Sequence, residues 1–173
     1  VGMMNPPYSM GSKTNPVLYE INFINHLLDS IVEDGRVAVI VPQSTFTGKT
    51  KEEKKIKEEI LKNHTLEGVI TLNKNTFYRI GTNPCIAIFT THNPHSKNKM
   101  CKFINFENDG YIVSKHIGLI DDGSHKDKKQ HLLDVWFGKN EAPTKFCVET
   151  TIEADDEWLH SFYYFNDEIP SEE

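Results

Sequence analysis

The chain has 173 residues, of which 38% are hydrophobic and 25% are charged, and its formal net charge is -6. This balance is typical of a globular protein with one domain, or one domain plus an extension, and the acidic charge argues against strong DNA binding by this chain alone. No stretch is long and apolar enough to span a membrane, and Cys85, Cys101 and Cys147 lack CxxC spacing. We therefore expect a cytoplasmic protein without disulfides or a metal site.

The first distinctive feature in chain order is Asn5-Pro6-Pro7-Tyr8, which follows a short strand-like run, Val1 to Met4. Two consecutive prolines fix φ at both positions and keep Asn5 extended. The result is a rigid corner with an amide on one side and an aromatic ring on the other. Such a corner suits the binding of a planar group that carries an amino nitrogen. An ordinary Pro-Pro turn with a surface tyrosine is the alternative interpretation.

Helical spacing of apolar residues follows. It predicts a helix that begins at Asn15-Pro16, buries a stripe from Leu18 to Val32 and ends at Gly35. Val37 to Val41 is a continuous apolar run, which is typical of a strand covered by helices on both faces, and Pro42 ends it.

A loop over residues 43–48 comes next and contains Phe46, for which we favour core packing over a place in a pocket. Residues 51–62 mix lysine and glutamate, which predicts a mostly solvated helix with only Ile56, Ile60 and Leu61 facing inward.

Two more apolar runs, Leu66 to Leu72 and Cys85 to Thr90, predict strands on either side of a polar loop that contains Phe77. Strands alternating with helices indicate an α/β sheet, in which ligands bind at the carboxyl ends of the strands. The Asn5–Tyr8 tetrapeptide follows a strand-like run, so it falls at such an end.

The second half carries weaker signals. A strand is predicted at residues 100–106, and a turn at residues 108–110 is expected to return the chain as a hairpin through Tyr111 to Val113. Residues 115–130 form a polar stretch whose lysines at 126, 128 and 129 either contact DNA or are simply solvated. A strand is expected at residues 145–148, and a short helix after Asp155-Asp156-Glu157. The aromatic cluster of that last segment, Trp158, Phe162, Tyr163, Tyr164 and Phe165, belongs either to a core or to an interface.

Four segments together resemble the N6-adenine DNA methyltransferases, in particular the modification subunits of type I restriction-modification systems and related fused enzymes. They are residues 5–8 (NPPY), 34–42 (DGRVAVIVP), 66–70 (LEGVI), and 76–89, where Thr-Phe leads to a glycine and an apolar strand. The tetrapeptide is shared with other amino-methyltransferases, but the whole series is more characteristic of the DNA adenine enzymes. The resemblance covers about the first half of the chain.

The resemblance implies a fold and roles for particular residues. The fold is α/β: the second half of a Rossmann-like methyltransferase sheet over residues 1–92, with a small mixed α+β extension over residues 93–173. Asn5 Oδ1 and the Pro6 carbonyl would accept the two hydrogens of the target amine, with Pro7 keeping the corner stiff. Tyr8 and Phe77 would contact the two faces of a flipped adenine.

S-adenosylmethionine is the methyl donor that the resemblance implies. In the family a glycine-rich turn and an acidic residue bind it, and both come before the tetrapeptide, so we expect the cofactor-binding residues upstream of residue 1. The chain is then a part of a methyltransferase that is inactive alone. Its expected partners are DNA, the missing N-terminal half, and a specificity and a restriction subunit, but no membrane.

Two alternatives stay open at this point. The tetrapeptide also occurs in amino-methyltransferases that act on protein glutamine or on guanine in ribosomal RNA. The second alternative is a non-catalytic interaction or scaffold module that keeps the fold for assembly.

Overall fold

The computed structural model describes residues 1–8, 14 and 19–167, apart from the side chains of residues 165–167. Within these residues the strands are β1 (Gly2–Met4), β2 (Arg36–Pro42), β3 (Thr65–Leu72), β4 (Pro84–Thr90), β5 (Cys101–Phe106), β6 (Tyr111–Ser114), β7 (Gly118–Asp121) and β8 (Cys147–Thr150). The helices are α1 (Glu20–Ser30), α2 (Ser44–Thr47), α3 (Lys51–Asn63), α4 (His125–Trp136) and α5 (His160–Asp167). No helix of the described part is long and apolar enough to cross a membrane.

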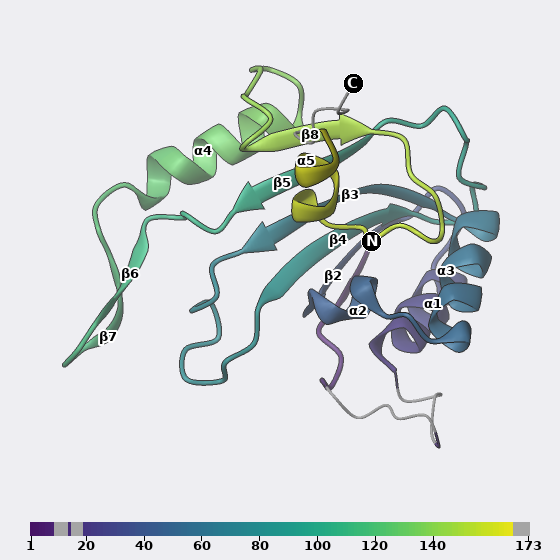
Figure 1. Ribbon diagram of the computed structural model, residues 1–173, viewed down its shortest axis with the longest axis horizontal. Coiled ribbons are helices and arrows are strands. Elements are labelled where there is room, and N and C mark those ends of the chain that lie inside the picture. The colour runs from purple at the N-terminus through teal and green to yellow at the C-terminus, as the bar shows by residue number, and fades with distance from the viewer. Residues whose placement is uncertain (9–13, 15–18, 168–173) are drawn as a thin grey trace, which may run out of the picture.

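A six-stranded mixed sheet in the order β1-β2-β4-β3-β5-β8 forms the centre of the molecule (Figure 1). β1 pairs parallel with β2, and β3 pairs parallel with β5. β4 is antiparallel to both of its neighbours, β2 and β3. The predicted α/β class is therefore confirmed. β5 and β8, which belong to residues 93–173, continue the sheet that residues 1–92 begin. The functional division at residue 92 stays a prediction.

The larger core lies on the sheet face that α1, α3 and α5 cover. Alternate residues of β2 point toward it, and Val37, Val39 and Val41 are buried there against Ile24 and Ile60 of the helices. Each fully buried aliphatic side chain of this kind contributes roughly 1.5–3 kcal/mol. This face therefore supplies most of the hydrophobic stabilisation of the described residues.

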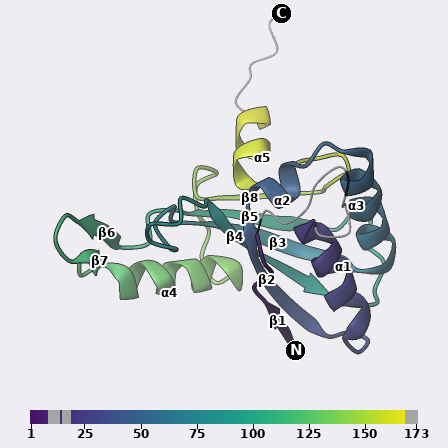
Figure 2. The same cartoon turned by 90° about the horizontal axis from the view of Figure 1, so that it is seen from below.

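Among the described helices, only α4 covers the opposite face, and Figure 2 shows α4 and α5 on opposite sides of the sheet. α4 buries Val135 against Ile70 and Ile104 in a smaller cluster. The outward residues of β2 and β4, such as Ile40 and Ile88, are only half-buried. The prediction that the β2 strand is covered on both faces is therefore wrong for this face.

The helix before β2 is shorter than predicted. Its expected start, Asn15-Pro16 with Leu18, lies outside the described residues. α1 ends at Ser30, Val32 is 74% exposed, and Gly35 is not a helix cap. Gly35 instead lets neighbouring segments of the chain pack closely, because a Cβ there would collide with the side chains of Ile31 and Thr91.

α3 confirms the predicted helix of residues 51–62, but it buries one lysine, Lys57, which was predicted to be solvated. Lys57 is 2% exposed, and its Nζ donates to the Phe46 carbonyl at 3.0 Å and to the Asp156 carbonyl. It also lies 4.6 Å from the centre of the Trp158 ring. Burial lowers the pKa of Lys57 to about 8. A signal was present, since residue 57 lies on the inward stripe with Ile60 and Leu61.

The aromatic residues near α2 and α5 belong to the core. Phe46 is fully buried with its ring 5.7 Å from that of Trp158, as favoured from the sequence. Trp158 is itself fully buried, and Tyr163 packs on Phe103 at 4.4 Å. For these residues the open choice between core and interface is settled in favour of the core; the side chain of Phe165 lies outside the described residues.

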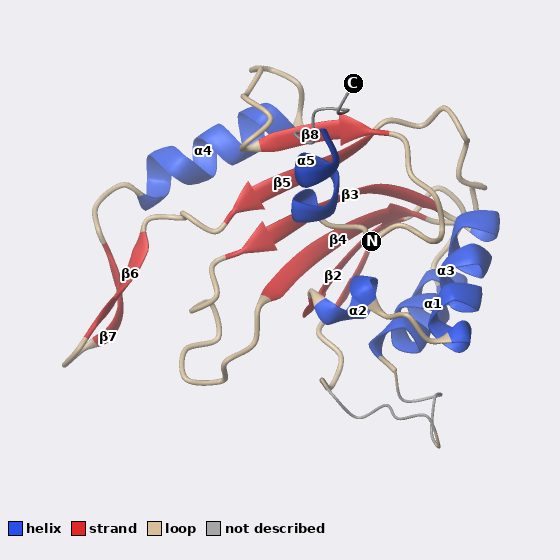
Figure 3. Ribbon diagram, viewed as in Figure 1, coloured by secondary structure: helices blue, strands red, loops and turns tan. Residues whose placement is uncertain are grey.

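The second half departs most from the predictions, as Figure 3 makes clear by its separate two-stranded sheet. β6 pairs with β7 and not with β5. The turn at Gly110, with φ of 88°, leads the chain away from the main sheet, and β8 takes the place beside β5. The polar stretch of residues 115–130 contains β7 and the first half of α4, and this half of the helix carries Lys126, Lys128 and Lys129.

Candidate functional site

The carboxyl ends of β1 and β3 lie at the same end of the sheet. β1 runs parallel to β2, while β2 and β3 are both antiparallel to β4, so β1, β2 and β3 share one direction. The segment after β1 and the loop after β3 therefore leave the sheet at the same end of the strands (Figure 1). This topology brings residues 5–8 and residues 73–83, which we call the tetrapeptide wall and the loop wall, to the same site.

The tetrapeptide wall is held by its prolines and by one tyrosine. Pro6 is buried and Asn5 is exposed. The Tyr8 hydroxyl donates to Asn5 Oδ1 at 2.6 Å and lies 3.2 Å from the Ile40 carbonyl of β2. Partial burial, with smaller contributions from Cys85 and Glu20, raises the pKa of Tyr8, so the hydroxyl keeps its proton and acts as a donor near neutral pH.

The two walls meet through an aromatic pair. The rings of Tyr8 and Phe77 lie 6.1 Å apart between centroids in an edge-to-face arrangement with an angle of 61°. A flat base held between two parallel rings requires a separation of about 7 Å, twice the contact distance of carbon atoms. A base can therefore enter between these rings only if one of them rotates or shifts slightly.

The loop wall is fastened at its start by Asn73, which is 7% exposed. Asn73 Nδ2 donates to Asp109 Oδ1 at 2.9 Å and to the Tyr111 carbonyl at 3.1 Å. Its Oδ1 accepts from the Asn75 amide at 2.9 Å, and its carbonyl accepts from the Thr76 hydroxyl at 2.7 Å. These bonds fix the backbone that carries Phe77. Asn73 is not among the residues predicted from the sequence, because its place depends on contacts with Asp109 and Tyr111, far along the chain.

Other chemistry has little support among the described residues. No group of three or more His, Cys, Asp or Glu residues in the described part could hold a metal ion. All three cysteines are buried, and burial raises the pKa of each thiol, so none is a ready nucleophile. The groups that lie together at the carboxyl ends of β1 and β3 are instead amide and carbonyl acceptors beside two aromatic rings. They suit the binding of a flat, amine-bearing group.

The described residues do not form a cradle for S-adenosylmethionine. A nucleotide-like cofactor is bound at a glycine-rich turn between a strand and a helix N-terminus. Here only Gln43 lies between β2 and α2, and no run of glycines connects a described strand to a helix. The groups at this end of the sheet thus suit an amine-bearing base, and the described residues contain no glycine-rich turn of this kind.

Comparison with known proteins gives the family. The N-6 DNA methylase family matches residues 3–166. The type II restriction enzyme and methyltransferase RM.BcgI of Heyndrickxia coagulans is 51% identical over 172 residues. That alignment covers 99% of this chain and 27% of the relative, so the chain spans about a quarter of the length of that protein.

Solved structures share the fold. The type I restriction-modification methyltransferase subunit of Streptococcus thermophilus superposes with a TM-score of 0.63 at 20% identity, over 87% of this chain and 34% of that one. The type I restriction enzyme EcoKI M protein gives a TM-score of 0.56 at 17% identity, over 73% of this chain and 29% of that one. The predicted methyltransferase-type fold is thereby confirmed, and the match over residues 3–166 shows that the chain belongs to the N-6 DNA methylase family.

Proposed function

We propose that this chain forms the target-base half of a DNA adenine-N6 methyltransferase of a restriction-modification system. The observation that carries the proposal is that Asn5, Tyr8 and Phe77 lie together at the carboxyl ends of β1 and β3. Tyr8 is hydrogen-bonded to Asn5, and its ring contacts that of Phe77. Membership of the N-6 DNA methylase family supports the same substrate.

The acceptors of the tetrapeptide wall explain how a poor nucleophile becomes reactive. The lone pair of the adenine amino nitrogen is delocalised into the ring. If one N–H points at Asn5 Oδ1 and the other at the Pro6 carbonyl, the nitrogen becomes more tetrahedral and its lone pair turns out of the ring plane. Prolines at positions 6 and 7 fix these acceptors before the substrate arrives, which is electrostatic preorganisation. S-adenosylmethionine, bound by residues outside the described part, supplies the electrophilic methyl group.

The aromatic pair explains how the base is held. An adenine inside a duplex hides its amino group, so it must rotate out of the stack. Tyr8 and Phe77 then replace the lost stacking, at roughly 1–3 kcal/mol per aromatic contact. In the described state the Tyr8 hydroxyl already donates to Asn5 Oδ1. That oxygen has two lone pairs, so the incoming amine either shares it with Tyr8 or displaces the hydroxyl.

The chain is proposed to act with partners, in the cytoplasm. A net charge of -6 gives little general attraction to DNA, so most phosphate contacts are assigned to other segments or subunits. These are a cofactor-binding N-terminal half, a specificity subunit or domain, and a restriction subunit or domain. The combined restriction and methyltransferase name of the Heyndrickxia relative supports such an arrangement. Family membership favours DNA over protein glutamine or ribosomal RNA, and the complete tetrapeptide favours an enzyme over a scaffold.

The test is methyl transfer from labelled S-adenosylmethionine to unmethylated DNA. The chain alone is compared with the assembled enzyme, by which we mean the chain joined to the cofactor-binding segment of its own gene or of the Heyndrickxia relative. We expect label only with the assembled enzyme, and recovered as N6-methyladenine after digestion to nucleosides. Label in protein or RNA, or none in DNA for any assembled form, would contradict the proposal.

A further inference from the structure

A cleft adjoins the Phe77 side of the site. It has a volume of about 440 Å³ and lies between the loop wall and the β6–β7 hairpin. The residues that matter for its chemistry are Lys74, Phe77, Tyr78, Arg79, Asn83 and Val113. Because Phe77 lines both places, the cleft begins where the base-binding site ends.

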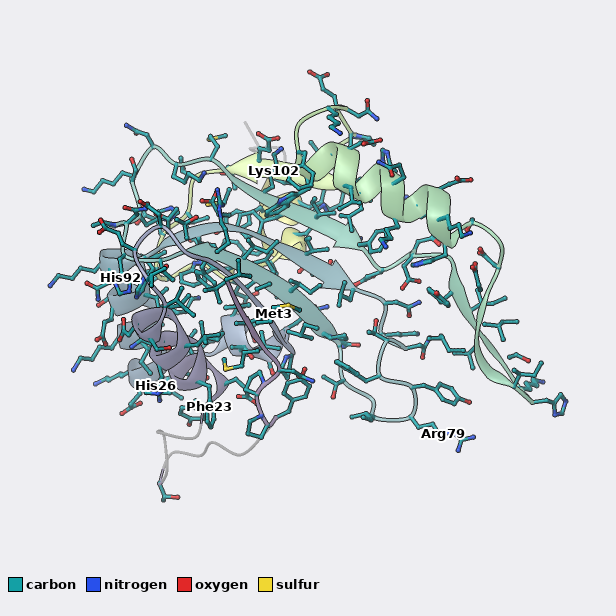
Figure 4. The ribbon with its side chains drawn as sticks, turned by 180° about the vertical axis from the view of Figure 1, so that it is seen from behind. Met3, Phe23, His26, Arg79, His92 and Lys102 are labelled. Carbon is teal, nitrogen blue, oxygen red and sulfur yellow. The ribbon has the colours of Figure 1, made fainter. Side chains whose placement is uncertain are left out.

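The charge of the cleft differs from that of the chain as a whole. Its lining includes two cations, Lys74 and Arg79, and no carboxylate, whereas the whole chain carries a net charge of -6. Both cations belong to exposed residues. Arg79 lies with its guanidinium carbon 5.1 Å from the centre of the Tyr78 ring, and Figure 4 shows it at the outer end of the loop wall. The cleft is thus a locally positive surface beside the site.

The two sides of the cleft are fastened to each other. At the base, Asn73 of the loop wall donates to Asp109 and to the Tyr111 carbonyl at the start of the hairpin. Further out, Gly118 of β7 faces Tyr78, and a Cβ on this glycine would lie 3.3 Å from the tyrosine ring. Its φ of 98° also requires glycine. The cleft therefore has a defined width and is not a gap between two independent loops.

The backbone of Arg79 is unusual for its residue type. Its φ of 70° is left-handed, a region in which non-glycine residues other than Asn, Asp and His are uncommon. Gly81 two residues later has the same φ. This pair of left-handed residues makes the sharp bend that places the guanidinium at the outer end of the loop wall. Strained backbone of this kind is concentrated at functional positions.

We propose that this cleft binds the sugar-phosphate backbone of the DNA strand next to the flipped adenine. Lys74 and Arg79 contact phosphates on the side of the site where Phe77 stacks, and Tyr78 supports the guanidinium of Arg79. The inference rests on the proposed function, since it takes the neighbouring base as the target. The two positive charges attract phosphates although the chain as a whole is acidic. They lie next to the rings proposed to hold the base, where the backbone of the same strand must pass.

Phosphate contacts have a measurable signature, because each one releases a counterion from the DNA. The logarithm of the affinity then falls with the logarithm of the salt concentration by about 0.9 per contact. Between 50 and 200 mM salt, two contacts correspond to roughly a twelvefold loss of affinity, since a fourfold change in salt is raised to the power of about 1.8.

The experiment measures DNA affinity of the assembled enzyme over this salt range for the wild type, Lys74→Gln/Arg79→Gln and the matched control Lys55→Gln. Lys55 is an exposed lysine of α3, on the far side of the sheet from the hairpin (Figures 1 and 2). We expect the double variant to lose affinity equally for DNA with and without the recognised site, and to show a salt slope smaller by about 1.8. Lys55→Gln should keep the wild-type slope.

Two further readings separate the possible failures. Lys74→Gln/Arg79→Lys keeps one of the two charges and should restore about half of the slope that the double variant loses, whereas a merely structural role of Arg79 would not be rescued in this way. A double-variant slope equal to that of Lys55→Gln, with N6-methyladenine still formed by the wild type, would overturn this inference and leave the proposed function intact. An assembled wild type that makes no N6-methyladenine would overturn both. A melting temperature equal to that of the wild type confirms that the variants are folded.

Discussion

The two walls of the site are rigid for different reasons. The tetrapeptide wall follows β1, a three-residue strand that pairs on one side only within the described residues, and two prolines limit its backbone. The loop wall has no proline between Asn73 and Asn83 and depends on the hydrogen bonds of Asn73. One wall is stiff through its covalent geometry, and the other through contacts with residues about 36 positions away.

This difference decides where changes should be felt. A substitution inside the tetrapeptide wall alters the acceptors themselves and leaves the backbone in place. A substitution that loosens the loop wall can lie outside it, at Asp109 or along the β6–β7 hairpin. Each variant described below is measured in the assembled enzyme.

Asn5→Ala should have the largest effect. It removes one preorganised partner of the reacting amine, which typically costs a factor of about 10² to 10³ in kcat. The prolines still hold the corner, so affinity for DNA should stay near the wild-type value. The measurement is kcat for methyl transfer together with a DNA dissociation constant. Asn63→Ala on α3 is the matched control, and an unchanged kcat for Asn5→Ala would remove this residue from the mechanism.

Phe77→Ala should come next. It deletes one of the two stacking rings, so about 1–3 kcal/mol of base binding is lost, or roughly 5- to 150-fold in kcat/KM. Phe77→Tyr keeps the ring and should stay close to the wild type. Phe137, which is 68% exposed on the end of α4, supplies the control Phe137→Ala. If both alanine variants behave alike, Phe77 has no special contact with the base.

Asn73→Ala tests the hydrogen-bonded anchor. It leaves the Tyr111 carbonyl and the Asn75 amide without their partner, and an unsatisfied buried group costs about 1–3 kcal/mol. We expect faster amide hydrogen exchange over residues 73–83 and 109–113, with the exchange of β2 unchanged. Exchange that rises evenly over the whole chain would mean that Asn73 supports the fold in general and not the loop wall.

Tyr8→Phe should have the smallest effect. It keeps the ring and removes only the hydroxyl that donates to Asn5 Oδ1. Loss of one such hydrogen bond is worth about 0.5–1.5 kcal/mol, so kcat should stay within roughly tenfold of the wild type. Tyr8→Ala should fall much further because it removes the stacking surface. A loss for Tyr8→Phe as large as for Asn5→Ala would assign the hydroxyl a direct part in the reaction.

Much of the sheet could be predicted from the sequence because its signals are local. β2, β3 and β4 are short apolar runs bounded by breakers, and α3 has a clear helical period with a capping box at Thr50 and Glu53. The end of α1 could not be predicted in this way. The apolar pattern continues through Val32, but the chain must leave the helix after Ser30 to enter β2.

The site was predictable in its residue types and only partly in its supports. Four consecutive residues are enough to predict a rigid corner with an amide and an aromatic ring. The predicted partner, Phe77, lies beside Tyr8 in the structure. The roles of these residues stay predictions. Asn73 and the β6–β7 hairpin depend on contacts between residues far apart in the chain. Lys57 likewise bonds to a carbonyl 99 residues away. Sequence periodicity carries no information on such pairs.

The most direct test of the central claim is the structure of the assembled enzyme with DNA that contains its recognised adenine. The account predicts an extrahelical adenine between Tyr8 and Phe77, with its amino nitrogen about 2.7–3.2 Å from Asn5 Oδ1 and from the Pro6 carbonyl. A target adenine that remains stacked in the duplex, or is held away from Asn5, would contradict it.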